Sequence, residues 1–205
     1  MAVKVLARGA EAVIYLGWFL GERAVYKERV RKSYRHPEID SYLRRVRTLS
    51  EARIMVDARR AGFPTPHIFD VDADSGVIVM EYVEGERARD WINRHPDDAR
   101  GLLFSLGRML GRLHSAGIVH GDLTTSNIII SAHGPVFIDM GMGSRGAGVE
   151  EFGVDLHLFK EALESTHSHI EGLFQEACDG YADEMPIAEK VFERVRDIEK
   201  RGRYT

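Results

Sequence analysis

The spacing of apolar residues changes from a strand-like to a helix-like period within the first sixty positions of the chain. Up to about residue 30 apolar and polar residues alternate, and apolar runs on both sides of Gly21-Glu22 predict a β-hairpin that turns at these two residues. From 38 to 61 apolar residues recur every three to five positions, which predicts a helix. The pattern therefore indicates a small sheet followed by one long helix.

Strand-like and helix-like segments then separate along the chain. Two more strands are expected at 67–71 and 77–83, joined by a turn at Asp74-Ser75-Gly76. After Gly85 the period becomes helical, most clearly at 97–116, where four leucines fall on one stripe. The predicted strands therefore gather before residue 84, and most of the predicted helix follows it.

The later part of the chain contains one short apolar hairpin inside this helical pattern. Strands are expected at 128–130 and 136–138, around a turn at Gly134-Pro135. Four glycines between 140 and 150 predict a segment without regular structure, and from Glu151 to the end the pattern is helical again. We therefore expect a mostly helical second half.

Together these elements predict an α+β fold in a single domain with two lobes. The N-lobe, 1–84, is expected to be a small antiparallel sheet with one helix. The C-lobe, 85–200, is expected to be truncated and helical, and 201–205 form a short basic tail. Clefts between lobes are preferred ligand sites, so the residues near the lobe boundary are the first place to look for chemistry.

Composition excludes several classes of protein. The chain has 205 residues, a formal net charge of −4 and a single cysteine, Cys178. One cysteine makes neither an internal disulfide nor a thiolate zinc site, which indicates a reducing, cytoplasmic setting. No run of about 18 apolar residues occurs, so no membrane span is expected. An acidic chain is not a general nucleic-acid binder, although local basic patches remain open.

The strongest chemical signal is the segment His120-Gly121-Asp122-Leu123-Thr124-Thr125-Ser126-Asn127. Asp139 follows Asn127 by twelve positions, in Asp139-Met140-Gly141. This spacing matches the catalytic loop and metal-binding Asp of protein kinases. Asp122 would accept a proton from the attacking hydroxyl or water, and Asn127 and Asp139 would bind Mg²⁺ through hard oxygen ligands. Turn residues alone could give such a pattern by chance in roughly one chain in a thousand.

An ATP site also requires partners for the phosphates and the adenine, and the N-lobe offers candidates. Lys27 ends the third predicted strand and Glu51 lies on the following helix, so Lys27 would contact the α- and β-phosphates and Glu51 would orient it. The backbone of Gly9-Ala10-Glu11 could approach the phosphates, although a G-x-G-x-x-G loop is absent and a plain hairpin turn is an equal reading. Adenine would bind the backbone at Met80, Glu81 and Val83, which end the fifth strand.

Beyond generic kinase features, the chain resembles the PRPK-type minimal kinases, the kinase/ATPase subunits of the KEOPS (EKC) complex. The segments that carry this resemblance are Lys32–Pro37, Arg47-Thr48, Glu51-Ala52-Arg53, His120–Asn127, Gly9–Ala12, Val154-Asp155-Leu156, Ser165-Thr166-His167 and Arg201-Gly202-Arg203. The resemblance covers nearly the whole chain. It implies a two-lobed kinase fold, Mg²⁺-ATP binding, autophosphorylation or ATP hydrolysis, and a role in threonylcarbamoyladenosine modification of tRNA.

The resemblance also implies partners. The carbamoyltransferase (Kae-type) subunit would contact the C-lobe and the tail residues Arg201, Gly202 and Arg203. A further small KEOPS subunit would bind the N-lobe.

The segment 29–60 holds ten Arg or Lys against four Asp or Glu, so its basic helix could touch tRNA, although a solvated helix face is the simpler reading. His120 and Asp155 would support the catalytic loop, and a helix-start carboxylate is the alternative reading of Asp155.

Two departures from ordinary kinases keep alternatives open. Gly121 replaces the Arg of H-R-D, and the thirteen residues between Gly141 and Asp155 contain no A-P-E, so the usual peptide platform is missing. These features favour an ATPase-like switch or a kinase with few targets. A pseudokinase scaffold, or a small-molecule phosphotransferase of the aminoglycoside or choline type, is the alternative function.

Overall fold

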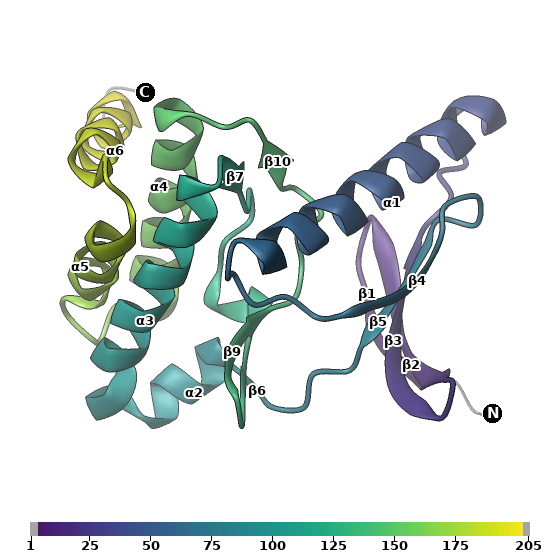
Figure 1. The fold of residues 1–205 in the computed structure, drawn as a ribbon, viewed down its shortest axis with the longest axis horizontal. Helices are drawn as coiled ribbons and strands as arrows, with labels where there is room; N and C mark the ends of the chain where they lie inside the picture. The colour runs from purple at the N-terminus through teal and green to yellow at the C-terminus, as the bar shows by residue number, and fades with distance from the viewer. Residues whose placement is uncertain (1–3, 203–205) are drawn as a thin grey trace. The chain divides into compact units, whose positions relative to one another are not determined.

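The structure, a computed structural model, describes residues 4–202, and Figure 1 traces its elements. The strands are β1 (Lys4–Arg8), β2 (Ala12–Phe19), β3 (Glu22–Arg29), β4 (Ile68–Asp72), β5 (Val77–Glu81), β6 (Glu86–Arg87), β7 (Ile118–Val119), β8 (Ile128–Ser131), β9 (Gly134–Phe137) and β10 (Ser144–Arg145). The helices are α1 (Pro37–Arg60), α2 (Ala88–Arg94), α3 (Pro96–Ser115), α4 (Val149–Thr166), α5 (Leu173–Glu184) and α6 (Ala188–Gly202), with a 3₁₀ turn η1 at Thr125–Asn127.

These elements divide into two compact units. The first unit contains the chain up to Val56 together with Pro66–Val83, and the second contains Asp57–Thr65 and everything from Glu84 onward. The first unit is therefore the sheet-rich one and the second the helical one, which confirms the predicted α+β, minimal kinase-like fold class. Along residues 4–202 there is no helix with the length and apolar character that a membrane crossing requires.

The first unit is built on a five-stranded antiparallel sheet in the order β1-β2-β3-β5-β4. The β2–β3 hairpin turns at Leu20-Gly21, because Phe19 pairs with Glu22. The predicted turn at Gly21-Glu22 was one residue too late. Both turn residues have positive φ, 49° at Leu20 and 93° at Gly21, which is the backbone twist that two-residue hairpins favour.

The helix α1 follows the predicted period and confirms the expected helix to within one residue at each end. Its start carries Glu38 and Asp40, whose charges suit the positive end of the helix dipole. In the first unit α1 is tied to the sheet by polar side chains, since Arg44 donates to the carbonyl of Ser75 in the β4–β5 turn at 2.9 Å.

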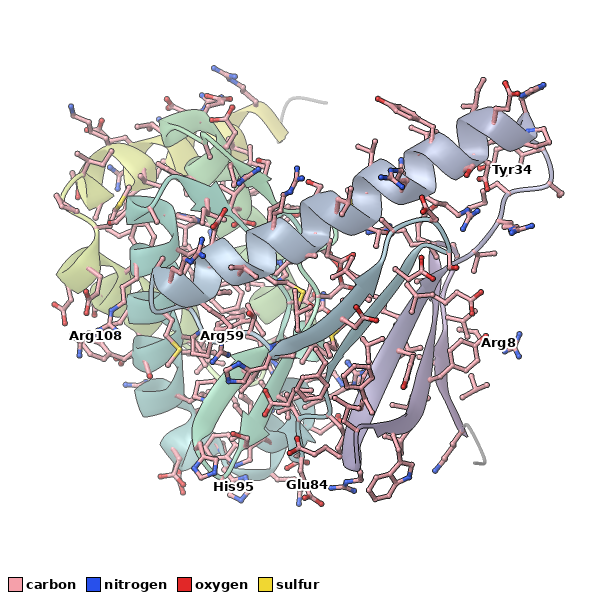
Figure 2. All side chains as sticks on the ribbon, turned by 45° about the vertical axis from the view of Figure 1, so that its right-hand side comes forward. Arg8, Tyr34, Arg59, Glu84, His95 and Arg108 are labelled. Atoms are coloured by element: carbon pink, nitrogen blue, oxygen red, sulfur yellow. The ribbon has the colours of Figure 1, made fainter. Side chains whose placement is uncertain are left out.

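Helices α3, α4, α5 and α6 form the body of the second unit, coloured teal to yellow in Figure 1. The leucine stripe predicted on α3 is buried, with Leu103, Leu106 and Leu110 each at most 1% exposed. At the surface Arg108, labelled in Figure 2, and Arg112 both donate to Glu184, at 2.6 and 2.7 Å. Hydrogen bonds from Arg112 and Arg108 hold the pKa of the Glu184 carboxyl at about 2. This cluster joins α3 to the end of α5.

Glycines let α3 and α5 approach each other at backbone distance. A Cβ placed on Gly107 would collide with the carbonyl of Ala177, and one on Gly180 would collide with the carbonyl of Phe104. Each glycine therefore lies against a backbone carbonyl of the other helix, at a distance that no larger residue allows.

We expect Gly107→Ala to lower the free energy of unfolding by about 3 kcal/mol, because the added methyl group forces the two helices apart. Gly101→Ala is the matched control on the same helix, since nothing lies within 4 Å of an added Cβ there. It should stabilise the protein by about 0.5 kcal/mol through helix propensity. Urea denaturation followed by circular dichroism measures both, and an equal effect of the two variants would contradict the close contact.

Two short sheets in the second unit differ from the sequence-based prediction. The β8–β9 hairpin turns at Ala132-His133, since Ser131 pairs with Gly134, so Gly134 and Pro135 lie in β9 rather than in the turn. Pro135 fits there because β9 is an edge strand of the order β6-β8-β9. The glycine-rich segment was predicted to lack regular structure, but it contains β10 and the start of α4. Strand β10 pairs with β7, and the paired residues Ser144 and Val119 are 25 positions apart in the sequence.

Candidate nucleotide and magnesium site

Lys27 and Glu51, the predicted phosphate partners, form a salt bridge inside the first unit. Lys27 Nζ lies 2.5 Å from Glu51 Oε1, and the two residues are 7% and 2% exposed. Arg29, two residues along β3, reaches the other oxygen, with Nη2 2.5 Å from Glu51 Oε2. The sequence analysis did not single out Arg29. The sequence could have indicated Arg29, because side chains alternate along a strand and residues 27 and 29 therefore lie on one face of β3.

The loop Gly9-Ala10-Glu11 joins β1 to β2. It is held by two cations, Lys32 after β3 and Arg47 on α1. Lys32 Nζ donates to the carbonyl of Ala10. The carboxylate of Glu11 pairs with Arg47 at 3.0 Å and with Lys32 at 3.4 Å. This tethering gives the loop a fixed shape without the glycine-rich sequence of ordinary kinases. Contact of its backbone with phosphate stays a prediction.

The segment predicted to bind adenine lies at the end of β5. Met80 is 3% exposed, and Glu81 is the last residue of the strand. The N–H of Glu81 donates to the carbonyl of His67 at 2.8 Å, and the Glu81 carboxylate accepts the N–H of His67 at 3.1 Å. The Glu81 amide is therefore committed to the sheet. Backbone contact of Met80, Glu81 and Val83 with adenine stays a prediction.

In the second unit the catalytic-loop residues Asp122 and Asn127 contact each other. The side-chain amide of Asn127 donates to the carbonyl of Asp122 at 3.0 Å and to its carboxylate oxygen Oδ2 at 3.1 Å. Because the amide nitrogen is used in this way, the oxygen Oδ1 of Asn127 is the atom left to bind a cation. The loop thus sets a carboxylate and an amide oxygen side by side.

The β8–β9 hairpin places Asp139 at the same end as Asn127. The N–H of Ile138 donates to the carbonyl of Asn127 at 2.9 Å, one step beyond the strand pairing. Asp139 comes next, and its Oδ1 accepts the N–H of Gly141 at 2.9 Å. Met140, where most kinases have Phe, is fully buried. Two residues twelve positions apart in sequence are therefore brought to one end of a hairpin.

These oxygen donors fit magnesium. Mg²⁺ binds through one or two protein carboxylates or amide oxygens and completes its shell with phosphate and water oxygens. Asp139 and Asn127 supply ligands of that kind. Between Lys4 and Gly202 no three His, Cys, Asp or Glu side chains cluster in a way that could hold a metal ion by themselves. The arrangement suits a metal that arrives with a phosphate ligand.

Asp155, near the start of α4, holds the backbone of the catalytic loop. Its Oδ2 accepts the N–H of His120 at 2.7 Å, and its Oδ1 accepts the N–H of Gly121 at 2.8 Å. His114 Nε2 donates to Oδ2 at 3.1 Å. Burial tends to raise the pKa of this carboxyl, but the hydrogen bond and charge of His114, with help from His120, bring the pKa of Asp155 below its usual value. Asp155 is therefore a buried anion with three donors.

His114 links this carboxylate to α5 and was missed by the sequence analysis. Its Nδ1 lies 2.9 Å from the hydroxyl of Tyr181, and both residues are at most 1% exposed. Burial raises the pKa of Tyr181 well above its ordinary value, so the phenol keeps its proton. Tyr181 is 67 positions from His114, and no local pattern joins two such residues. The chain of contacts runs from α5 through α3 to the catalytic loop.

His167 supports the same loop from its other side. Its Nε2 lies 3.1 Å from the hydroxyl of Thr125, and its Nδ1 lies 2.9 Å from Oδ1 of Asn93. Burial, the neighbouring His169 and Arg89 lower the pKa of His167. The neutral ring then donates from Nδ1 to Asn93 and accepts the Thr125 hydroxyl proton at Nε2. This explains why a histidine follows Ser165-Thr166 in the sequence.

Gly121 occupies a position that no other residue fits easily. Its φ is +78°, and an added Cβ would collide with the carbonyl of Met142. We expect Gly121→Ala to lower the free energy of unfolding by about 2 kcal/mol and to displace the catalytic loop. Gly117→Ala is the control, because its φ is +72° but nothing lies within 4 Å of an added Cβ.

The control variant should lose about 1 kcal/mol from the backbone conformation alone. Thermal denaturation compares the two variants, and the difference between them isolates the collision with Met142. A Gly121→Ala variant as stable as Gly117→Ala would show that the loop moves freely away from Met142.

Comparison with known proteins agrees with this geometry. A family model described as "RIO domain" matches residues 19–143, which is more than half of the chain. The matched segment includes Lys27, Glu51, Asp122, Asn127 and Asp139. The sheet-rich unit, the helical unit and the catalytic-loop pattern thus define an atypical, kinase-like protein.

Relatives over the full length narrow this class. The "KEOPS complex subunit Bud32" of Pyrococcus abyssi is 43% identical over 212 residues, covering 98% of this chain and 96% of that protein. A "Probable bifunctional tRNA threonylcarbamoyladenosine biosynthesis protein" of Methanothermobacter thermautotrophicus is 48% identical over 202 residues, covering 98% of this chain and 36% of that protein. The chain spans about a third of such bifunctional relatives. It belongs to the RIO-domain family and, within that family, to the Bud32-like proteins that its sequence resembles.

Proposed function

We propose that the chain is a Mg²⁺-ATP-dependent atypical Ser/Thr kinase or ATPase. The observation that carries the proposal is the grouping of oxygen ligands in the second unit: Asn127 folds back on Asp122, and the hairpin sets Asp139 at the end where Asn127 lies. Hard oxygen donors of this kind suit phosphoryl transfer, in which most of the work is positioning and charge neutralisation. The family supports ATP and Mg²⁺ as ligands in general terms.

Each residue has a distinct task in this proposal. Asp122 accepts the proton of the attacking hydroxyl or water at its carboxylate, and its bond from Asn127 fixes the orientation of that carboxylate. Asp139 and Asn127 hold the metal, which when bound neutralises the phosphate charge. Lys27 binds the phosphates, and Glu51 fixes the direction of its ammonium group. Asp155 and His120 keep the loop backbone in place.

Asp122→Asn tests this division of tasks. The variant keeps the shape and an acceptor oxygen for Asn127 but loses the base, so ATP turnover should fall at least about 100-fold while the Kd for MgATP changes less than about threefold. Isothermal titration calorimetry and phosphate release measure the two quantities. Unchanged turnover would contradict the role of Asp122 as the base, and full tRNA modification by a complex that contains the variant would favour the scaffold reading.

We further propose that the chain acts within a KEOPS-type complex that makes threonylcarbamoyladenosine in tRNA. The name of the Pyrococcus abyssi relative, which the chain covers almost completely, supports this role. The carbamoyltransferase subunit is expected on the second unit and tail. Arg201 lies in the last turn of α6, Gly202 ends this helix, and Arg203 lies outside the described residues.

The surfaces of each unit support partner binding. In the first unit Ile39, Tyr42 and Val46 leave an exposed apolar stripe on α1, and Tyr34, labelled in Figure 2 beside the start of that helix, is 76% exposed. A small KEOPS subunit would cover this stripe. In the second unit a cavity of about 860 Å³ lies among α4, α5 and α6, next to His167. It offers the carbamoyltransferase a place to insert side chains.

Direct tRNA contact through 29–60 has weaker support. Seven of the ten basic side chains in this segment form ion pairs: Arg29 with Glu51, Lys32 with Glu11, Arg35 with Asp40, Arg44 with Asp40, Arg45 with Asp74, Arg47 with Glu11, and Arg60 with Asp57. Paired cations attract phosphates less than free ones. We therefore place tRNA contact mainly on the partner subunits.

A further inference from the structure

Glu51 is shared between two cations rather than one. Lys27 binds Oε1 and Arg29 binds Oε2, each at 2.5 Å, and all three residues are at least nine-tenths buried. Lys27 and Arg29 extend from the same face of β3, and Glu51 comes from α1. An ordinary kinase pair needs only the lysine and the glutamate, so the arginine requires an explanation.

Arg29 is suited to fixing a carboxylate. Its guanidinium is rigid, planar and always charged, whereas the ammonium of Lys27 is a point charge on a flexible stem. Arg29 Nη2 also lies 3.5 Å from the carbonyl of Arg47, one turn before Glu51 on α1. Arg29 therefore contacts both the side chain of Glu51 and the helix that carries it.

The charges of the three groups matter as well. A lone Lys27–Glu51 pair sums to zero, whereas one carboxylate between two cations sums to +1. In a buried setting the carboxylate's charge is then divided between Arg29 and Lys27. Arg29 therefore holds Glu51 through one oxygen, and Glu51 holds Lys27 through the other.

We propose that Arg29 is a positioning residue of the nucleotide site. It holds Glu51 in place whether or not nucleotide is bound, and Glu51 in turn keeps Lys27 positioned to bind the phosphates of a nucleoside triphosphate. This inference rests on the proposed function, because it assigns a task within ATP binding.

A purely structural role is the alternative, and the same unit contains a matched control for it. Arg44 is also 7% exposed, pairs with Asp40 at 3.0 Å and donates to the carbonyl of Ser75. Arg44 thus forms a buried ion pair within α1 and joins the helix to the β4–β5 turn through its hydrogen bond to Ser75, but among the bonds of the described residues it has no contact with Lys27 or Glu51. If both arginines serve only stability, substituting either one should lower the melting temperature without a specific change in the Kd for MgATP.

The experiment compares wild type, Arg29→Met, Arg29→Lys and Arg44→Met. Calorimetry gives the Kd for MgATP, steady-state kinetics give KM and kcat, and thermal denaturation reports folding. We expect Arg29→Met to raise the Kd and KM for MgATP about tenfold while kcat changes less than about threefold, since ground state and transition state lose the same contact. Arg29→Lys restores the charge without the planar fork, so its Kd should rise only about threefold.

Arg44→Met should lower the melting temperature as Arg29→Met does but leave the Kd within about twofold of wild type. An unchanged Kd in folded Arg29→Met, or an equal increase in Arg44→Met, would overturn the inference. If Arg29→Met fails to fold, Arg29→Lys decides, and an unchanged Kd in that variant overturns it. Wild-type protein that binds no MgATP would refute the proposed function itself, which distinguishes the two failures.

Discussion

Asp139→Asn should lower ATP turnover at least about 100-fold and leave the fold intact. The substitution keeps an oxygen that can accept the N–H of Gly141, a bond of 2.9 Å in the wild-type loop. It removes the negative charge that Asp139 would contribute to the metal site. Losing one preorganised charge at a developing transition state costs about two to three orders of magnitude in rate. The predicted defect therefore concerns chemistry and not folding.

Phosphate release at saturating MgATP measures this defect, and circular dichroism checks the fold. Asp97→Asn is the control, because Asp97 is an exposed residue in the first turn of α3. It should keep wild-type turnover. Turnover within about threefold of wild type in Asp139→Asn would show that this carboxylate does not bind the catalytic metal.

Asp155→Asn should lower both the stability of the protein and its kcat. Three donors, the N–H groups of His120 and Gly121 and Nε2 of His114, converge on the Asp155 carboxylate. An amide in its place turns an NH₂ group toward at least one of these donors. Breaking a buried charged network of this kind costs about 3 kcal/mol. The displaced loop should also lower kcat by about tenfold or more, because catalytic geometry is sensitive to small shifts.

The pH dependence of stability gives an independent check on Asp155. Because the folded-state pKa is lowered, the ionised carboxylate stabilises the protein above its unfolded-state pKa of about 3.9. That contribution is lost as the pH falls through the lower, folded-state pKa. Wild type should therefore lose more stability than Asp155→Asn as the pH is lowered below about 5.

Glu161→Gln on the same helix is the control, since the Glu161 side chain is 62% exposed and its ion pair with His157 is 3.4 Å long. It should leave stability near wild type at each pH. Parallel pH profiles for wild type and Asp155→Asn would contradict the role assigned to the Asp155 charge.

Local periodicity was enough to predict most elements of the first unit. Alternation predicted the strands and a three-to-five spacing predicted α1, because each signal lies within a few residues of its element. The pairing of β10 with β7 escaped prediction, since a two-residue strand has no period and its partner is 25 positions away. Element ends at Gly134 and Pro135 were misassigned because a glycine and a proline there suggest a turn.

In the candidate site, too, residues with a local sequence signal were predicted and residues that meet only in the fold were not. The spacing of Asp122, Asn127 and Asp139 indicated the site because the loop and hairpin that carry these residues are local. Supporting residues such as His114 and Tyr181 could not be found from spacing, since they meet only through helix packing. Arg29 could have been predicted from the sequence, because the alternation of side chains along a strand puts it on the same face as Lys27.

The most direct test of the central claim follows γ-labelled ATP with Mg²⁺ in three mixtures. They contain the protein alone, the protein with the carbamoyltransferase subunit, and the protein with that subunit and tRNA. We predict Mg²⁺-dependent turnover that Asp139→Asn abolishes. Label released as free phosphate and accelerated by the partner and tRNA indicates a coupled ATPase, and label on protein indicates a kinase and identifies its acceptor. Bound nucleotide without turnover in any of the three mixtures would contradict the account and favour a scaffold.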